Sequence, residues 1–307
     1  MIIFGKNYHC PMIQMLCPEH WTDYELLDCG NFEKLERFGA YVLIRPEPQA
    51  IWEPVWPQTR WKHEAHARFV RSKKQQHEQR ESLKGGWTML KNMPQRWQIT
   101  YKNNDFTIKL KLSLTSFGHI GVFPEQACNW DFIYTHLKQM PGLHKSVLSL
   151  FAYTGAASLA ARAAGADVVH LDSVKQVVAW AGENMEQSGY DNIRWVVEDA
   201  LTFVKREVKR GKRYDAVIMD PPAYGRGPSG EKWTLQNGLP EIMKITARLL
   251  NPDYGMFVLN LYSMGFSSLI GLNLANQAFP DKIKETGEFY LCAKSGVKLP
   301  LGTFLRF

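Results

Sequence analysis

The chain has 307 residues, 45% of them hydrophobic, and a formal net charge of +7. This length and composition allow a large buried core and predict two domains. The same composition excludes a disordered or a repeat protein. The sequence has no run of about 18 apolar residues and no signal-peptide core in residues 1–11, so we expect a cytoplasmic protein with no membrane partner. Its five cysteines are odd in number and include no Cys-x-x-Cys pair, so we expect no metal and no disulfide framework.

Residues 1–118 differ from the rest of the chain in their pattern of strand-like segments and prolines, which predicts a small β-rich domain. Residues 39–45 and 106–112 have the composition of strands, and the second alternates apolar with polar side chains. Several prolines break the chain between these segments. Residues 119–307 are expected to form the second domain, which is entered through a helix at residues 129–140.

The positive charge is concentrated in residues 60–111. Thirteen Lys or Arg residues face four Asp or Glu residues there, a surplus of nine, so the rest of the chain sums to −2. Trp61, Trp87 and Trp97 are interleaved with these charges, which is typical of a surface that contacts phosphates and stacks bases. A solvated loop around residues 71–84 explains the same charges, and the sequence leaves both interpretations open.

An alternation of apolar runs and helical segments begins at residue 147. A strand at residues 147–151 enters Phe-Ala-Tyr-Thr-Gly at residues 151–155, and an alanine-rich helix follows and ends at Gly165. The other strands and helices are predicted in chain order at residues 167–171, 174–188, 193–197, 201–209, 214–219, 256–263, 289–292 and 302–305. The alternation predicts a doubly wound, Rossmann-like α/β sheet that is mostly parallel, with right-handed crossovers and an antiparallel last strand.

Aspartates stand at the ends of three predicted strands: Asp172, Asp199 and Asp220. Ligands bind at the carboxyl ends of parallel strands, so we expect Asp172 to accept the hydroxyls of a ribose and Asp199 to accept an adenine amino group. NAD fits the same layout, but its fingerprint needs three glycines, and here Gly155 stands alone in the turn. S-adenosylmethionine has no phosphate, and a one-glycine turn flanked by acids suits it better.

The sequence Asp-Pro-Pro-Ala-Tyr at residues 220–224 is the predicted reactive tip. Two consecutive prolines make a rigid lip whose carbonyls remain acceptors, so Asp220 and the Pro221 carbonyl would receive the hydrogens of an exocyclic amine. Tyr224 would stack on a base rotated out of its helix. Alternatively, Pro221 and Pro222 merely end a strand and Tyr224 is a surface aromatic. The two acidic strand ends that precede the tip favour the catalytic interpretation.

At these residues the sequence resembles the class I S-adenosylmethionine-dependent methyltransferases, and more narrowly the bacterial family that includes large-subunit ribosomal-RNA base methyltransferases. The resemblance extends to residues 119–126, which are similar to a segment that lines the cofactor pocket in that family, and to residues 24–30 and 45–52. It implies S-adenosylmethionine as methyl donor, S-adenosylhomocysteine as product and RNA, in particular ribosomal RNA, as partner.

Pattern and resemblance together predict two groups of site residues. The cofactor-binding residues are Gln126, Phe151, Tyr153, Thr154, Gly155, Asp172, Ser173, Asp199 and Ala200, and the catalytic residues are Asp220, Pro221, Pro222 and Tyr224. Two of these have an ordinary structural interpretation as well, because Gln126 fits a helix cap and Tyr153 fits a buried aromatic.

One departure from the family bears on the chemistry. Members that make 5-methylcytosine need a cysteine nucleophile after strand four or five, because C5 is not nucleophilic until a thiolate adds to C6. No cysteine follows either strand here, so only Cys128 or Cys292 reaching the site would supply one. Transfer to a nitrogen or oxygen, which needs no covalent intermediate, fits better.

The predicted substrate contacts are Arg226, Lys232 and Asn260. Arg226 and Lys232 belong to a glycine-rich stretch, residues 225–233, that is expected to form a lid ordering on substrate, or else an ordinary long connection. The sequence thus predicts an S-adenosylmethionine-dependent methyltransferase acting on a nitrogen of an RNA base. The alternatives are a methyltransferase acting on a protein or small metabolite, and a non-catalytic RNA-binding protein that retains the fold.

Overall fold

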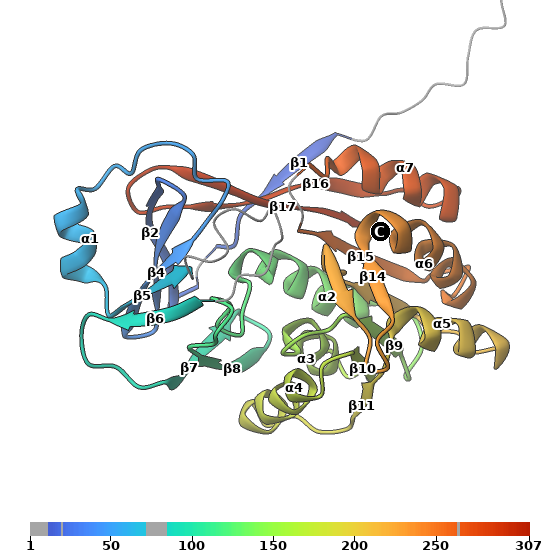
Figure 1. The fold of residues 1–307 in the computed structure, drawn as a ribbon. Coiled ribbons are helices and arrows are strands. Elements are labelled where there is room, and N and C mark those ends of the chain that lie inside the picture. The colour runs from blue at the N-terminus through green and yellow to red at the C-terminus, as the bar shows by residue number, and fades with distance from the viewer. Residues whose placement is uncertain (1–11, 20, 72–84, 263–264) are drawn as a thin grey trace, which may run out of the picture.

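The computed structural model describes residues 12–19, 21–71, 85–262 and 265–307, and an eight-stranded sheet dominates it (Figure 1). The strands of this sheet, in spatial order, are β1 (Ile13–Leu16), β16 (Glu285–Cys292), β17 (Lys298–Arg306), β15 (Met256–Leu261), β12 (Ala216–Met219), β9 (Ser146–Leu150), β10 (Asp167–Asp172) and β11 (Ile193–Val197). Strands β9 to β12 and β15 are mutually parallel, and β17 runs antiparallel to β15 and β16. The predicted fold class is confirmed.

Helices cover both faces of the large sheet because its strands alternate apolar side chains between the two faces. Val147 of β9 packs in a core with α2 (Ala127–Gln139) and α3 (Ala156–Ala163), near α4 (Lys175–Ser188). Leu148 packs in a second core with α5 (Ala200–Lys209), α6 (Leu235–Leu249) and α7 (Ser268–Ala278). No helix in the described part of the chain is long and apolar enough to cross a membrane.

The N-terminal part is rich in strands, as predicted. A five-stranded sheet contains β2 (Tyr24–Gly30), β3 (Glu33–Phe38), β4 (Tyr41–Pro46), β5 (Ala67–Arg71) and β6 (Gly85–Met89), with α1 (Gln58–Glu64) between β4 and β5, and β7 (Arg96–Lys102) and β8 (Thr107–Ser113) form a separate hairpin. The division of the chain at residue 118 stays a prediction. Strand β1 pairs with β16 of the large sheet, and the β16–β17 hairpin reaches back to β2, where Lys294 N–H donates to Leu26 O.

Hydrogen bonds from α4 hold β8 against the large sheet. Trp180 Nε1 donates to the carbonyl of Lys111 at 2.9 Å, and the Lys111 N–H donates to Asn184 Oδ1 at 2.8 Å. The Asn184 amide in turn donates to the carbonyl of Thr154 at 2.9 Å. These bonds fix the chain that leaves β8. Residues 114–118 contact the N-terminal strands, and residues 121–126 reach the carboxyl ends of the central strands, where the Gly121 carbonyl accepts the Thr154 hydroxyl.

The three tryptophans of the basic segment have structural roles. Trp61 has no exposed surface, and its Nε1 donates to Asp28 Oδ2 at 3.0 Å. Trp87 and Trp97 are half-buried and donate to the backbone carbonyls of Thr115 and Phe38. The prediction that Trp61 stacks on bases is therefore wrong.

The charges of the same segment are only partly accounted for. Arg68 pairs with Glu33 at 2.8 Å, so it is not a free cation on the surface. Residues 72–84, which hold Lys73, Lys74, Arg80 and Lys84, lie outside the described residues.

Substituting Trp61→Phe should lower the free energy of unfolding by about 1–3 kcal/mol, because it leaves the buried Asp28 carboxylate without one of its donors. Urea denaturation followed by far-UV circular dichroism measures this change. Trp56→Phe is the matched control, since Trp56 is half-buried and stacks under Arg60. Equal stability of Trp61→Phe and wild type would contradict the structural role.

Candidate active site

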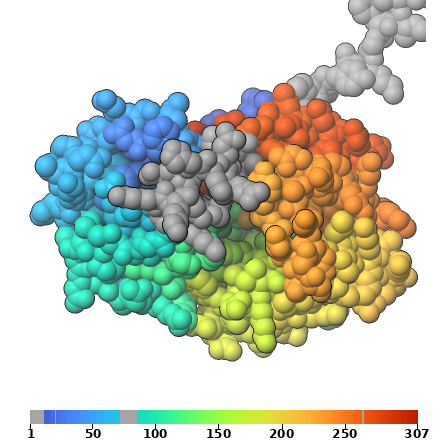
Figure 2. All heavy atoms as spheres, viewed as in Figure 1, coloured from blue at the N-terminus to red at the C-terminus, as the bar shows by residue number. Residues whose placement is uncertain are grey.

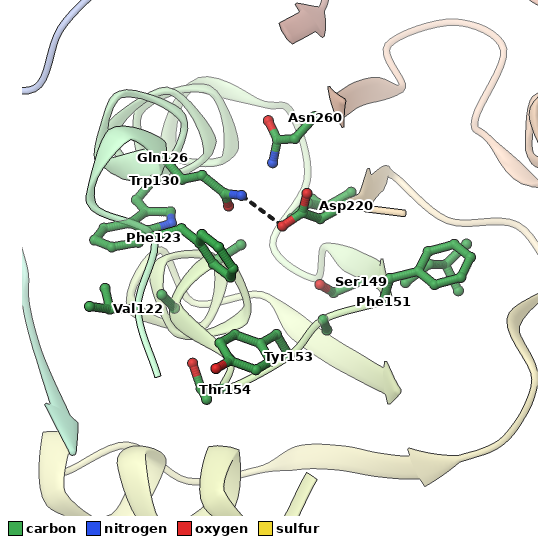
Figure 3. A pocket seen from close by; sticks show the side chains of 16 residues that line it. Val122, Phe123, Gln126, Trp130, Ser149, Phe151, Tyr153, Thr154, Asp220 and Asn260 are labelled. Carbon is green, nitrogen blue, oxygen red and sulfur yellow. Dashed lines mark hydrogen bonds between the residues drawn. The ribbon is translucent and has the colours of Figure 1, made fainter. Parts of the chain in front are cut away.

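A pocket opens at the carboxyl ends of β9 and β12, where the strand order reverses (Figure 3). Its lining comes from the segment before α2, from α2 itself, from β9 and the loop after it, from the start of α3, and from the ends of β12 and β15. This is the switch point at which doubly wound sheets bind their ligands.

The loop after β9 has an unusual backbone. Phe151 and Tyr153 have positive φ angles of 55° and 47°, and Gly155 has a φ of 92°. Positive φ is uncommon outside glycine and costs about 1–3 kcal/mol per residue, so other interactions must hold this loop. A Cβ on Gly155 would lie 3.1 Å from the Ala181 Cβ, which gives a packing reason for glycine in addition to its φ.

Asp172 at the end of β10 anchors that loop. Its carboxylate accepts the backbone N–H groups of Tyr153 and Val174, each at 3.0 Å. Burial raises the pKa of Asp172, and the backbone donors, which include Ser173 N–H, act in the opposite direction. Asp172 thus lies beneath the loop and beside the pocket.

Thr154 joins the loop to the segment before α2. Its hydroxyl donates to the carbonyl of Gly121 at 2.7 Å, and its own carbonyl is the one bound by Asn184. The Thr154 hydroxyl is therefore already committed to a protein partner, whereas the Tyr153 side chain lines the pocket (Figure 3).

Gln126 and Asp220 meet inside the pocket. Gln126 Nε2 donates to Asp220 Oδ2 at 2.7 Å, which brings together two residues that the sequence assigned to different tasks. Burial raises the pKa of Asp220 to about 6; the bond from Gln126 opposes this rise, and the charge of Asp172 adds to it. Near neutral pH the carboxylate is ionised and its second oxygen remains an acceptor.

Aromatic rings form the wall opposite Asp220. Phe123 lines the pocket and packs against Tyr153, with ring centroids 5.5 Å apart, and against Tyr262, at 5.8 Å. Trp130 of α2 also lines the pocket. Residues 119–126, which include Phe123, match the segment that the resemblance assigns to the cofactor pocket. No local pattern indicates Trp130 or Tyr262, because an aromatic residue on an apolar segment gives no sign of what it faces.

The glycine-rich stretch after the prolines folds as a hairpin, and its role as a lid stays a prediction. Strands β13 (Tyr224–Arg226) and β14 (Lys232–Thr234) pair antiparallel, with Arg226 opposite Lys232. Trp233 anchors the hairpin, since its Nε1 donates to the Pro222 carbonyl at 2.7 Å and its ring packs on Phe151 with centroids 4.9 Å apart.

The pairing register decides which hairpin side chains face outward. Tyr224, Arg226 and Lys232 lie on the face opposite Trp233, because successive residues of a strand point to opposite sides. All three are exposed, and the hairpin forms part of the molecular surface (orange in Figure 2). Tyr224, with 60% of its surface exposed, lies outside the pocket lining.

The remaining predicted cofactor residues lie at the neighbouring strand ends. Asp199 caps α5 by accepting Thr202 N–H at 2.8 Å, and Ala200 is the buried first residue of that helix. The hairpin passes over this position, since a Cβ on Gly227 would lie 3.1 Å from the Asp199 Cβ. Asn260, at the end of β15, lines the pocket and is 4% exposed.

Comparison with known proteins agrees with this geometry. Residues 64–268 match the model of a family described as S-adenosylmethionine-dependent methyltransferase. The ribosomal RNA large subunit methyltransferase K/L of Shewanella frigidimarina is 28% identical over 153 residues, which are 48% of this chain and 20% of that protein. The chain thus spans about a fifth of the length of such curated relatives.

Two solved structures extend the comparison to nearly the whole chain. An S-adenosylmethionine-dependent methyltransferase from Agrobacterium tumefaciens is 33% identical, with a TM-score of 0.86 and coverage of 97% of this chain and 94% of that one. A methyltransferase solved in complex with S-adenosylhomocysteine is 17% identical, with a TM-score of 0.68 and coverage of 93% and 76%. The second likeness concerns the fold alone.

The raised pKa of Asp220 makes a prediction about stability. The folded protein holds this proton up to about pH 6, whereas an unfolded chain releases it near pH 4, so the Asp220 contribution to stability falls as pH rises through this window. The variant Asp220→Asn has no proton to release at this position. Its free energy of unfolding relative to wild type should therefore increase by up to about 1.4 kcal/mol per pH unit between pH 4 and 6.

Urea denaturation at pH 4, 5, 6 and 7 measures this difference. Asp253→Asn is the control, because it removes a carboxylate that is exposed to solvent. A stability difference between Asp220→Asn and wild type that is constant across this pH range would show that the Asp220 carboxyl is solvated.

Proposed function

Because the chain belongs to the family of S-adenosylmethionine-dependent methyltransferases, we propose that it methylates a nitrogen of a nucleobase in RNA. The observation that carries the proposal is a half-buried carboxylate with a raised pKa, Asp220, at the end of β12, followed by two prolines and facing a pocket at the switch point. Bound S-adenosylmethionine supplies an electrophilic methyl group on its sulfonium.

The residues around the pocket suit this cofactor. A carboxylate has about four acceptor positions, and three backbone N–H groups bind the Asp172 carboxylate. One position therefore remains for a ligand, and we assign a ribose hydroxyl to it. We assign the adenine to Asp199 and Ala200 under the hairpin. The strained loop at residues 151–155 contributes the pocket wall, and Asp172 holds its geometry through the Tyr153 N–H group.

Asp220 and Pro221 would act on the substrate amine. The free oxygen of Asp220 and the Pro221 carbonyl are acceptors, and neither proline has an N–H that would compete. Together they would orient the amine so that its lone pair points at the methyl group, and such orientation is worth roughly 7–11 kcal/mol.

The cysteines favour nitrogen over C5 of a pyrimidine as the methyl acceptor. Burial raises the pKa of Cys128 to about 12, and Cys292 is exposed on β16; neither belongs to the described residues that line the pocket. Neither of these two cysteines therefore supplies a thiolate nucleophile at the described pocket.

RNA as substrate is supported by the relatives and by the charge. The curated relatives are ribosomal RNA methyltransferases, and the exposed Arg226 and Lys232 stand on the hairpin beside the pocket, where they would bind phosphates. We extend the proposal to residues 1–118 as an RNA-binding part and, from the RNA substrate, to a cytoplasmic location.

The first test of the proposed function is direct. Isothermal titration should show binding of S-adenosylmethionine and S-adenosylhomocysteine and none of NAD. With tritiated S-adenosylmethionine, unmodified large-subunit ribosomal RNA transcripts should accept methyl groups, and this transfer should weaken steeply as salt rises. Methylation of a small neutral metabolite, with no salt dependence, would refute RNA as the substrate.

Two variants should separate catalysis from cofactor binding. Asp220→Ala should lower the rate of methyl transfer about 100-fold or more, with the affinity for S-adenosylhomocysteine within a few fold of wild type. Asp172→Ala should instead weaken that affinity, because it removes both a ligand acceptor and the anchor of the loop. Full activity of the first variant, or unchanged affinity of the second, would reassign the residue concerned.

A further inference from the structure

Three buried polar side chains lead from the C-terminal strand to the pocket. Arg306 of β17 donates from Nη1 to Asn129 Oδ1 of α2 at 2.9 Å, and Asn129 Nδ2 donates to Asn260 Oδ1 of β15 at 2.6 Å. Their exposed fractions are 9%, 1% and 4%. Arg306 is itself held by Glu285 Oε2 at 2.9 Å and by the ring of Phe132 beneath its guanidinium.

This relay fixes the direction of the Asn260 amide. A guanidinium has donors and no acceptor, so Asn129 must turn its oxygen towards Arg306. The Asn129 nitrogen then faces Asn260, whose oxygen must accept the hydrogen bond. The nitrogen of Asn260 is left as a donor, and Figure 3 shows it pointing towards Gln126 and Asp220 while the oxygen points away.

At this end of the pocket, Asp220 therefore presents an acceptor and Asn260 a donor. Gln126 occupies one oxygen of Asp220, so the other oxygen is the acceptor. The donor is Asn260 Nδ2, whose polarity depends on Asn129 and Arg306 and cannot reverse without leaving two donors facing each other in a buried site.

We propose that Asn260 donates a hydrogen bond to the unprotonated ring nitrogen that flanks the target amino group, and that Asn129 and Arg306 are positioning residues for this contact. The inference rests on the proposed function and specifies its substrate edge: an amine next to a ring acceptor. Adenine and cytosine present this edge, as does guanine through its N2 and N3 atoms. Uracil and the N1–H edge of guanine do not.

The decisive variant reverses the relay without touching the pocket. In Asn129→Asp, residue 129 still accepts from Arg306 but has only an oxygen to offer Asn260, so Asn260 must turn its nitrogen away and show its oxygen to the substrate. A good base contact is worth about 1–3 kcal/mol, so methyl transfer to the ribosomal RNA transcripts should fall about 10- to 100-fold.

A second substitution separates polarity from structural damage. Asn129→Leu removes the relay but does not reverse it, so Asn260 can still turn its donor towards the substrate. Methyl transfer should rank wild type above Asn129→Leu above Asn129→Asp, although Asn129→Leu leaves more buried groups unpaired and should be the less stable variant. The opposite activity ranking would show that Asn129 acts through stability alone.

A coupling measurement tests the contact itself. Once the methylated nucleotide has been mapped, it is replaced by a deaza analogue in which C–H stands for the ring nitrogen beside the amine. The analogue should lower wild-type transfer about 10- to 100-fold but should cost Asn260→Asp no more than a few fold, because the hydrogen bond is already lost. Losses that multiply in full would overturn the contact.

These outcomes are distinguishable from failure of the proposed function. Wild-type protein that binds S-adenosylmethionine but methylates no RNA refutes the RNA substrate and the inference with it. Wild-type protein that methylates RNA, with an equally active Asn129→Asp variant, overturns the inference alone. The affinity for S-adenosylhomocysteine should remain within a few fold of wild type in every variant, since none of these side chains belongs to the assigned cofactor site.

Discussion

The hydrogen bond between Gln126 and Asp220 is the interaction on which the pocket depends. Burial disfavours the charged form of the half-buried Asp220 carboxylate at the end of β12 unless donors surround it. Gln126 supplies one donor from a segment that precedes the whole central part of the sheet. That segment must therefore lie over the strand ends. Its position is secured where Thr154 binds Gly121 and where Trp180 binds Lys111, so the site and the packing beneath it are one arrangement.

The features of this arrangement that destabilise the folded state lie at the residues where methyl transfer is proposed. The loop after β9 holds Phe151 and Tyr153 at positive φ, and Asp220 remains ionised near neutral pH despite its burial. Both features destabilise the folded state, and both leave donors and acceptors in fixed positions before a substrate arrives. The Asp172 carboxylate offsets part of the cost, because its bonds to backbone N–H groups hold the loop in its strained form.

Much of the central sheet could be predicted from the sequence because buried parallel strands are short apolar runs separated by helices, and the positions of Asp172 and Asp220 follow from that alternation. The hairpin at residues 224–234 could not be predicted, because its glycines favour a loop and its anchor is a single tryptophan, Trp233. The burial of Trp61 was likewise invisible, since its partner Asp28 lies 33 residues away in the sequence.

The relay to Asn260 shows the same limit more sharply. Asn129 lies 131 residues from Asn260 and 177 from Arg306, and no local pattern in the sequence links them. Only folding brings α2, β15 and β17 together, and the direction of each amide then follows from the one before it. Sequence patterns therefore predict at which end of the sheet the pocket lies, whereas the direction of the donors and acceptors in the pocket is a property of the packed structure.

Helix α2 connects this polarity to the rest of the molecule. Asn129 belongs to the relay and Trp130 lines the pocket, while the Asp131 carboxylate accepts the Tyr101 hydroxyl at 2.8 Å and the Asn103 amide at 2.7 Å from the β7–β8 hairpin. Three consecutive residues thus tie the N-terminal strands, the pocket and the C-terminal strand to one rigid element. The N-terminal part consequently shapes the site through α2, whether or not it also contacts RNA.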